Sequence, residues 1–487
     1  MVVSSPDLGA LAPEIIVTLG ALVVLVLDFA LPRKYLFLLP YVSLVFVALA
    51  GWSCLSLWGR QEYHMYNMLA LDNLRLIMSL IVLAGTALAL LMSPPYLKRE
   101  EIEYGEYYAL VLFAALGMMV MAAGLNLVVI FVGLETFSIS VYILSAFARG
   151  RLPSYEAGMK YLLIGSFATA FLLYGMVLIY AATGSLFLTD IKRFLMTRPV
   201  LGDKLLTAGL ALMIVGFGFK VAAFPFHVWT PDVYEGAPTP VTAFMAAAVK
   251  TAAFAAFARV FMTALSPIQP LWEPILWWLA VLTMTFGNFV AIAQTNVKRM
   301  LAYSSIAHAG YALIALVAGT PEALAALSFY MLAYTLMTAG AFGAVVLLSG
   351  KGDTNSNIYD ICGLGFRFPW LGAAVTVFMV SLAGIPPTAG FFAKFYLFSA
   401  AVNRGLVSLA VVAVINSVVS VYYYFRVVVM MYMHRREQEA PSVPLRTYAP
   451  AAVSVGIAAV AVLVIGILPS EVLELAKTSV VLALTPR

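Results

Sequence analysis

Four side chains that can carry charge stand inside long apolar stretches of the sequence: Glu135, Lys220, Lys250 and Lys394. An ammonium group near the centre of a bilayer costs about 2.5 to 3.5 kcal/mol on insertion scales, so a charge there needs a partner or a function. Burial favours the neutral amine of a lysine, whereas a nearby carboxylate favours its ammonium form. Buried lysines combined with a glutamate therefore predict proton transfer. For any one of them taken alone, snorkelling to the interface or a structural ion pair is the alternative.

These four groups are expected at similar depth. Glu135 lies roughly 14 Å into its apolar span, Lys250 about 15 Å into another, and Lys394 about 10 Å beyond a helix break, at 1.5 Å per residue. Lys220 is adjacent to a second break. Two unit charges 4 Å apart attract by about 4 kcal/mol at an effective dielectric near 20, which is about three pKa units. Opening or closing a Glu135–Lys220 pair would therefore decide whether Lys220 passes its proton, through water, to Lys250 and then to Lys394.

Two histidines extend this predicted row. His227 ends the seventh apolar span, and His308 stands in the tenth span in YSSIAHAGY, among hydroxyl side chains. Imidazole titrates near neutral pH and can relay protons. A lone helical histidine is also often structural, and that alternative stays open for both residues.

Other buried or half-buried charges are expected to have local roles. Arg259 and Arg426 lie near span ends, where a long side chain can reach water and anchor the helix at the interface. Asp72 and Arg75, three residues apart, are expected to pair with each other.

The composition defines the class of protein. The chain has 487 residues, 63% of them hydrophobic and only 10% charged, against about 25% charged in soluble domains. It is therefore an all-α polytopic membrane protein, in contact with the lipid bilayer. Two cysteines cannot supply the four thiolates of an iron–sulfur cluster, and no metal site is expected. The net charge of +5 is spread through loops and gives no sign of nucleic-acid binding.

About fourteen transmembrane helices are predicted from apolar runs long enough to cross roughly 30 Å of hydrocarbon. The runs are 11–31, 36–58, 70–92, 107–124, 126–148, 158–183, 204–225, 239–264, 271–294, 300–319, 322–349, 370–401, 406–433 and 448–468. The first run is full length and is expected to be retained rather than cleaved as a signal peptide. No loop is long enough for a soluble domain.

Basic residues orient the chain. With fourteen spans, most clusters fall on one face, which the positive-inside rule makes cytoplasmic. These clusters are Arg33 and Lys34; Lys98 and Arg99; Arg149, Arg151 and Lys160; Lys298 and Arg299; Lys351 and Arg367; Arg435, Arg436 and Arg446. Both termini are then expected on the periplasmic side of a bacterial inner membrane. A basic loop on the opposite face is the exception; it contains Lys192, Arg193, Arg198 and Lys204.

The seventh and twelfth spans are expected to be broken helices, because glycine and proline interrupt both close to a lysine. The stretches are GFGFKVAAFPFH from residue 216 and SLAGIPPTAGFFAKF from residue 381. Interrupted spans at corresponding places in two halves are typical of inverted-repeat transporters. The expected organisation is 1–106, three flanking helices; 107–264, a first five-helix repeat; 271–433, a second, inverted repeat; and 434–487, a last helix and tail.

Several long stretches closely resemble the antiporter-like subunits of respiratory complex I, and among them the subunit N branch of the proton-pumping NADH:quinone oxidoreductases, relatives of mitochondrial chain 2. They are SYEAGMKYLLIGS (154–166), FKVAAFPFHVWTPDVYEGAPTPVTAF (219–244), VKRMLAYSSIAHAGY (297–311) and SLAGIPPTAGFFAKFY (381–396). The resemblance covers essentially the whole chain. The stretch around Glu156 and Lys160, and the short segment after the fourteenth helix, favour the subunit N branch.

The resemblance implies roles for single residues. Glu135 and Lys220 match the family's fifth-span glutamate and seventh-span lysine, while Lys250 and Lys394 match its eighth-span and twelfth-span lysines. Lys160 matches a further lysine, although an interfacial role is equally open for it. The resemblance also implies that this chain binds no cofactor itself. NADH, flavin, iron–sulfur clusters and quinone are expected in partner subunits, beside a neighbouring antiporter-like subunit and small membrane subunits.

The predicted function is proton translocation through a membrane-arm subunit of an NADH:quinone oxidoreductase, driven electrostatically by quinone reduction elsewhere. One alternative is a subunit of an Mrp-type cation/proton antiporter or of a membrane-bound hydrogenase, where the same fold and lysines recur. A second is a structural scaffold of the membrane arm. A stand-alone solute symporter is less favoured, since it would need a central substrate site.

Overall fold

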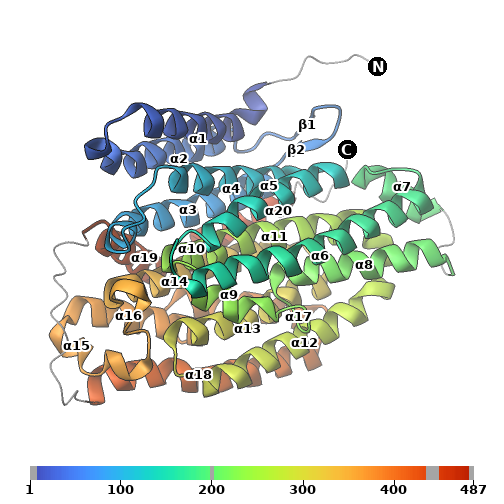
Figure 1. Cartoon of the computed structure of the whole chain (residues 1–487). Helices are drawn as coiled ribbons and strands as arrows, with labels where there is room; N and C mark the ends of the chain where they lie inside the picture. The colour runs from blue at the N-terminus through green and yellow to red at the C-terminus, as the bar shows by residue number, and fades with distance from the viewer. Residues whose placement is uncertain (1–7, 198–201, 435–448, 482–487) are drawn as a thin grey trace.

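The computed structural model describes residues 8–197, 202–434 and 449–481, and these residues form a helical bundle (Figure 1). The longer helices are α1 (Ala12–Ala30), α2 (Leu39–Ser56), α3 (Asn73–Arg99), α4 (Glu106–Ala123), α5 (Leu127–Ser145), α6 (Leu152–Thr183), α8 (Lys204–Val221), α12 (Gln269–Ala293), α13 (Val297–Ala318), α14 (Pro321–Leu348), α18 (Val407–Met433) and α19 (Ala449–Ile467). The shorter ones are α7 (Leu188–Thr197), α9 (Trp229–Gly236), α10 (Thr239–Phe244), α11 (Lys250–Arg259), α15 (Leu364–Arg367), α16 (Pro369–Ala383), α17 (Ala389–Asn403) and α20 (Pro469–Val481).

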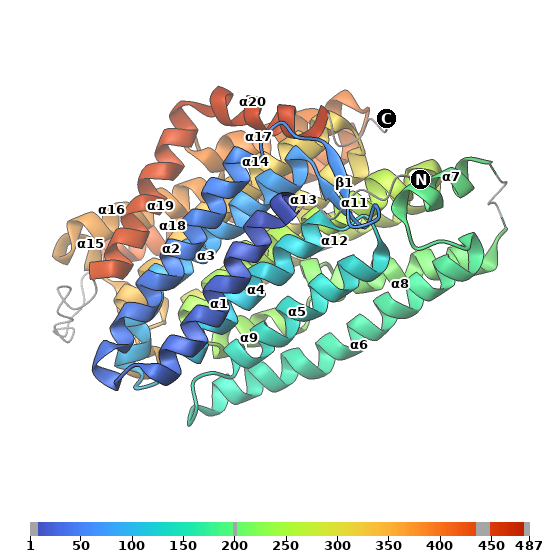
Figure 2. The same cartoon turned by 90° about the horizontal axis from the view of Figure 1, so that it is seen from above.

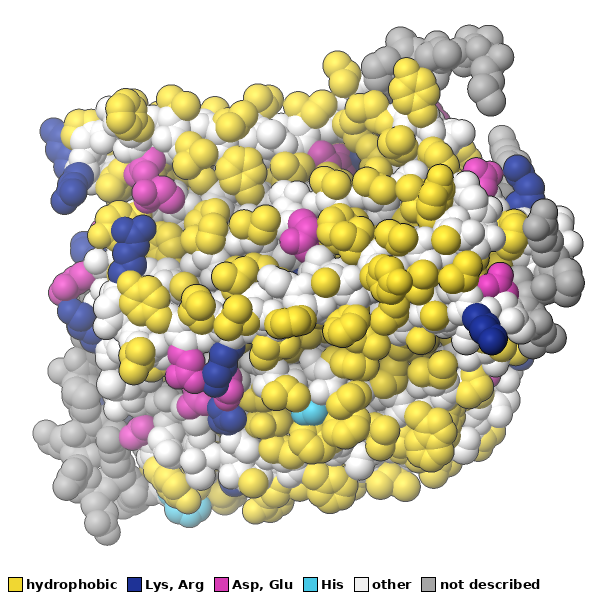
Figure 3. Space-filling view, turned by 45° about the vertical axis from the view of Figure 1, so that its right-hand side comes forward, with side chains coloured by type: hydrophobic (Ala, Val, Ile, Leu, Met, Phe, Trp, Pro, Cys, Tyr) yellow, Lys and Arg dark blue, Asp and Glu magenta, His cyan; other side chains and the backbone are white. Residues whose placement is uncertain are grey.

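The expected all-α membrane architecture is confirmed. Among the described residues, 13 helical segments are long and apolar enough to cross a membrane. The remaining predicted crossing, the twelfth, is the pair α16 and α17, which are too short singly because the chain breaks between them. Apolar side chains cover the middle of the face in Figure 3, and most charged side chains lie toward its two ends. That distribution suits a bilayer around the bundle.

Both predicted helix breaks are present. Helix α8 ends at Val221, and Ala222 adopts a left-handed conformation (φ +61°) before the chain re-enters a helix at α9. Helix α16 ends at Ala383, and the next residue, Gly384, has a φ of +85° that glycine adopts without strain. The residues from Ile385 to Thr388 then lead into α17. Both breaks therefore expose helix-end backbone groups next to a lysine.

The eighth crossing is irregular at its centre. It runs from α10 through a π-helical turn (Met245–Val249) into α11, whose first residue is Lys250. Every residue of this crossing from Thr239 to Met262 is buried. Single π-helical turns inside α-helices often mark functional positions.

Close helix packing sets the frame around the crossings. Helix α4 packs on α5 through Gly117 and Gly133, and α12 packs on α13 through Gly287 and Gly310, where an added Cβ would meet the neighbouring backbone. Small residues at such contacts let membrane helices approach closely. In the view of Figure 2, α6 and α8 run along one edge of the bundle, and α16, α19 and α20 lie toward the opposite one. The division into two five-helix repeats stays a prediction.

Several elements were not predicted. A short hairpin of β1 (Glu62–His64) and β2 (Leu69–Leu71) precedes α3, and α7 occupies part of the basic loop expected between spans. Helix α20 follows α19 and packs on α14 and α3, so the segment after the fourteenth crossing is more than a tail. The basic residues Arg198, Arg435, Arg436 and Arg446 lie outside the described residues.

Candidate functional site

Lys220 lies in the last turn of α8 and is buried at 3% exposure. Its ammonium donates to the Ser138 hydroxyl of α5 at 2.8 Å and lies 3.5 Å from the Tyr142 hydroxyl. Aromatic rings surround it, with the Phe137 ring centroid 5.5 Å away. Lys220 is thus held by neutral oxygens and ring faces.

Glu135 lies on the same face of α5 as Ser138, about one turn earlier. Within the described residues, its carboxylate forms no direct ion pair with Lys220, whose ammonium donates to Ser138 instead. The carboxylate is half-buried, and its Oε1 atom has no hydrogen-bond partner among the described groups. The two charges are near enough to interact electrostatically. The predicted pair is therefore present as a near approach and not as a contact, because the Ser138 hydroxyl takes the ammonium.

Lys250 occupies the middle of the bundle and is 3% exposed. Its ammonium donates to the main-chain carbonyl and the hydroxyl of Ser305 on α13. It also lies 5.6 Å from the centroid of the Tyr334 ring of α14. Lys250, which directly follows the π-helical turn, thus reaches from the eighth crossing to Ser305 of the tenth.

Lys394 binds the broken end of the helix that precedes it. From α17, its ammonium donates to the carbonyls of Leu382 and Ala383, the last residues of α16, and to the Ser417 hydroxyl of α18, all at 2.9 Å. The final carbonyls of a helix have no partner within it and carry the negative end of its dipole. The glycine-proline break therefore creates the acceptor site that the buried ammonium uses.

His308 lies between the second and third lysines and interacts electrostatically with both Lys250 and Lys394. Its Nδ1 atom is 2.6 Å from the Tyr330 hydroxyl, and its Nε2 atom is 3.1 Å from the Tyr424 hydroxyl, which also contacts Ser304. Both ring nitrogens therefore face hydroxyls that can give or take a proton.

An amide network adjoins this histidine. The Asn288 amide donates to the Tyr311 hydroxyl at 3.0 Å and accepts from Tyr423 at 2.9 Å. The Tyr311 ring lies under Lys394, with 5.0 Å between the ammonium and the ring centroid. Asn416 of α18 joins the same network through Asn288.

The two weaker candidates lie away from this row. The His227 ring packs against Phe224 and Phe286 in the segment between α8 and α9, and its Nδ1 atom has no partner among the described groups. Lys160 is 38% exposed near the start of α6 and pairs with Glu156 at 2.6 Å and Asp232 at 2.8 Å. Its position corresponds to the interfacial alternative.

Two local expectations were wrong. Asp72 caps α3 by accepting from the Arg75 backbone, but its carboxylate pairs with Arg259 at 2.8 Å, and the Arg75 guanidinium pairs with Glu14 at 2.6 Å. Arg259 is 2% exposed and is therefore no interfacial anchor. Burial alone would raise the pKa of Asp72, but the Arg259 charge holds it below its ordinary value. Arg426 is only partly buried and donates to the carbonyls of Ile292 and Gln294.

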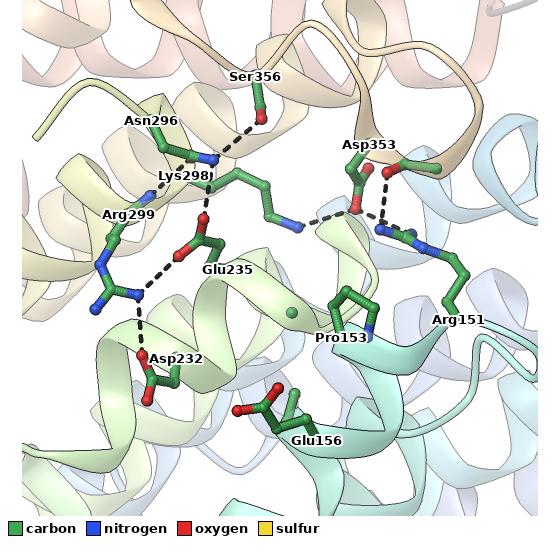
Figure 4. A pocket seen from close by; sticks show the side chains of 13 residues that line it. Arg151, Pro153, Glu156, Asp232, Glu235, Asn296, Lys298, Arg299, Asp353 and Ser356 are labelled. Carbon is green, nitrogen blue, oxygen red and sulfur yellow. Dashed lines mark hydrogen bonds and ion pairs between the residues drawn. The ribbon is translucent and has the colours of Figure 1, made fainter.

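The sequence did not predict a charge cluster around Asp353. Its carboxylate accepts from Lys298 at 3.0 Å, Arg151 at 3.3 Å, the Tyr96 hydroxyl at 3.0 Å and the Thr239 hydroxyl at 2.9 Å. Burial would raise the pKa of this carboxyl, but the Lys298 and Arg151 charges lower it below its ordinary value. Figure 4 shows Lys298 and Arg151 reaching Asp353 from opposite sides. Several basic clusters expected on one face do meet at this end of the bundle.

Among the described residues, no group of three or more histidine, cysteine, aspartate or glutamate side chains is arranged to hold a metal ion. Cys54 and Cys362 do not form a disulfide with each other. The candidate site consists of four buried ionisable groups, Lys220, Lys250, His308 and Lys394, with half-buried Glu135 near Lys220.

A helical bundle with two broken crossings and a buried row of lysines defines a class, that of antiporter-like membrane proteins. The family model described as "NADH:quinone oxidoreductase/Mrp antiporter, TM" matches residues 124–420, well over half of the chain. A protein of Trichlorobacter lovleyi named NADH-quinone oxidoreductase subunit N is 46% identical over 474 residues, 97% of each chain. The chain belongs to the NADH:quinone oxidoreductase/Mrp antiporter family and, within it, to the subunit N group.

Solved structures agree in fold. A chain of respiratory complex I from Thermus thermophilus, solved with aureothin bound, matches with a TM-score of 0.80 and 37% identity, covering 96% of this chain and 99% of that one. A chain of the Mrp complex from Dietzia sp. DQ12-45-1b matches with a TM-score of 0.81 and 21% identity, covering 97% of both chains. The second likeness shows the fold alone.

Proposed function

We propose that this chain conducts protons as a membrane-arm subunit of an NADH:quinone oxidoreductase. The observation that carries the proposal is that Lys220, Lys250 and Lys394 are each buried and each donate to neutral oxygens. An ammonium paired with a carboxylate is held in its charged form, whereas one surrounded by neutral acceptors can lose its proton at lower cost. Three such groups inside a membrane bundle suit a relay.

The proposed path follows the row. A change in charge near Glu135 alters the field at Lys220, whose proton passes to Lys250, then past His308 to Lys394. The contacts of His308 with Tyr330 and Tyr424 supply hydroxyls for this last step. Backbone groups freed from the helix ladder at the two breaks are suited to hold water between the side chains. His227 and Lys160 stay secondary candidates at the edge of this path.

The redox chemistry belongs to partner subunits in this proposal. NADH, flavin, iron–sulfur clusters and quinone would act there, and the energy would arrive through a neighbouring antiporter-like subunit and small membrane subunits. The subunit N names of the relatives support this assignment. We also propose that the chain lies in a bacterial inner membrane, with the end around Asp353 cytoplasmic and both termini periplasmic, because basic residues gather at the Asp353 end.

The experiment is Lys220→Ala in the assembled complex, reconstituted into proteoliposomes. The expected result is near-normal assembly with a reduced number of protons pumped per electron. Lys351→Ala is the matched control, because Lys351 is exposed and pairs with exposed Glu101. Unchanged pumping in Lys220→Ala would favour a structural scaffold. Assembly with antiporter subunits in place of quinone-reducing ones would favour the Mrp-type alternative.

A further inference from the structure

A polar cavity of about 330 Å³ opens at the end of the bundle where Asp353 lies. Its rim carries partly exposed charges from α9 and α13, namely Asp232, Glu235 and Arg299. Its inner wall is formed by Lys298 and Asp353, which are 1% and 7% exposed (Figure 4). The cavity thus reaches from the surface to a buried ion pair.

Lys298 of the buried Lys298–Asp353 ion pair lies on the same helix as Ser305, the partner of Lys250. Lys298 and Ser305 are seven residues apart on α13, two turns or roughly 10 Å, and therefore share one face of the helix. Ser305 is the residue that accepts the Lys250 ammonium. Tyr234 of α9, next to rim residue Glu235, also interacts with Ser305. The Lys298–Asp353 pair is therefore the wall between the cavity and the central lysine.

Asp353 and Lys298 differ in how many other hydrogen bonds hold them in place. Asp353 keeps three donors without Lys298, namely Arg151, Tyr96 and Thr239. Among the described residues, Lys298 has one other acceptor, the carbonyl of Ala237 at 2.9 Å. Release of Lys298 would therefore leave no buried carboxylate without a partner, and the wall can open at the lysine side chain.

The charges on the rim do not compete for that lysine. Arg299 bridges Asp232 at 2.9 Å and Glu235 at 2.7 Å, and Lys160 also binds Asp232. Glu156, which also lines the cavity, binds Lys160 at 2.6 Å, so the rim carboxylates are already paired and partly exposed to solvent. Lys298 is the cavity cation that lies between this solvent-exposed rim and Ser305.

We propose that the cavity is the aqueous entrance for protons that reach Lys250, and that the Lys298–Asp353 ion pair closes it. This inference rests on the proposed function and adds the access route to it. When Lys298 moves away, water joins the cavity to Ser305. A hydronium ion then gives its proton to the neutral amine of Lys250, which becomes an ammonium group, and the remaining water molecule stays in the cavity.

The test is cysteine labelling in membrane vesicles that hold the assembled complex, with the Asp353 end facing the medium. The background is Cys54→Ser with Cys362→Ser, and Ser305→Cys is the reporter for a membrane-impermeant methanethiosulfonate reagent. Labelling is expected to be slow with Lys298 in place and at least tenfold faster after Lys298→Met. Glu156→Cys on the rim should label rapidly in both backgrounds, and buried Ser420→Cys on α18 in neither.

A second variant tests the ion pair from the carboxylate side. Asp353→Asn keeps oxygen and amide groups for its neighbours but removes the charge that holds Lys298, so it should also speed Ser305→Cys labelling in complexes that assemble normally. Equal labelling rates with and without the ion pair would overturn the proposed entrance. That failure is distinct from failure of the relay, because labelling does not depend on proton pumping by Lys220 or Lys250.

Discussion

The ammonium of Lys250 binds both the carbonyl and the hydroxyl of Ser305, so that the eighth crossing is joined to the tenth at mid-bundle. Lys250 begins α11 directly after a π-helical turn, and Ser305 lies one turn before His308. This contact links the lysine row to the histidine and, through α13, to the charged cavity at the bundle end. A relay through Lys250 therefore has a neighbour on each side.

Gly384→Ala should impair pumping through Lys394. An added Cβ would lie 2.8 Å from the Lys394 side chain, and the φ of +85° disfavours alanine by about 1 to 2 kcal/mol. Gly405→Ala is the matched control, because Gly405 has the same φ with open space around it. Thermal denaturation of the assembled complex should show similar losses of stability, while only Gly384→Ala lowers protons pumped per electron. Equal pumping in both variants would show that the position of Lys394 is unimportant.

Asp353→Asn should destabilise the complex in a pH-dependent way. The pKa of Asp353 is held below 3.8, so its ionised form stabilises the fold above that pH, and this contribution is lost as pH falls through the lowered value. The stability difference between wild type and variant should therefore be constant from pH 7 to about pH 5 and shrink below about pH 4. Thermal denaturation across this range measures it. A difference that already shrinks between pH 7 and pH 5 would contradict the lowered pKa.

Glu14→Ala should be among the more damaging substitutions near the N-terminus. It leaves the Arg75 guanidinium, 1% exposed, without its counter-charge, and breaking a buried ion pair costs about 3 to 5 kcal/mol. Native gels should show a strong loss of assembled complex. The exposed pair of Lys477 and Glu474 offers the contrast, since Glu474→Ala should assemble normally. Normal assembly of Glu14→Ala would mean that Arg75 finds another partner.

The sequence predicted the helices well, because long apolar runs and glycine-proline interruptions are local signals. The breaks after Val221 and Ala383, and the burial of Lys220, Lys250 and Lys394, follow from them. Even the bonds of Lys394 to α16 could have been anticipated, since both groups flank one break.

The partners of most charges could not be predicted, because they come from distant segments. Arg259 pairs with Asp72, far away in sequence, where a local i,i+3 pair of Asp72 with Arg75 was expected. Asp353 lies in a loop with no motif, and only the fold brings Tyr96, Arg151 and Lys298 to it. Ser138 likewise separates Glu135 from Lys220 through packing that residue spacing does not show.

The most direct measurement of the central claim is the number of protons pumped per NADH oxidised by complexes carrying Lys250→Met or Lys250→Arg. Methionine removes the titratable amine, and arginine keeps the positive charge but does not release its proton. The proton relay predicts that both variants assemble, oxidise NADH and pump fewer protons per NADH than wild type. Full pumping by Lys250→Arg would contradict it, because a fixed charge would then be sufficient at the centre of the row.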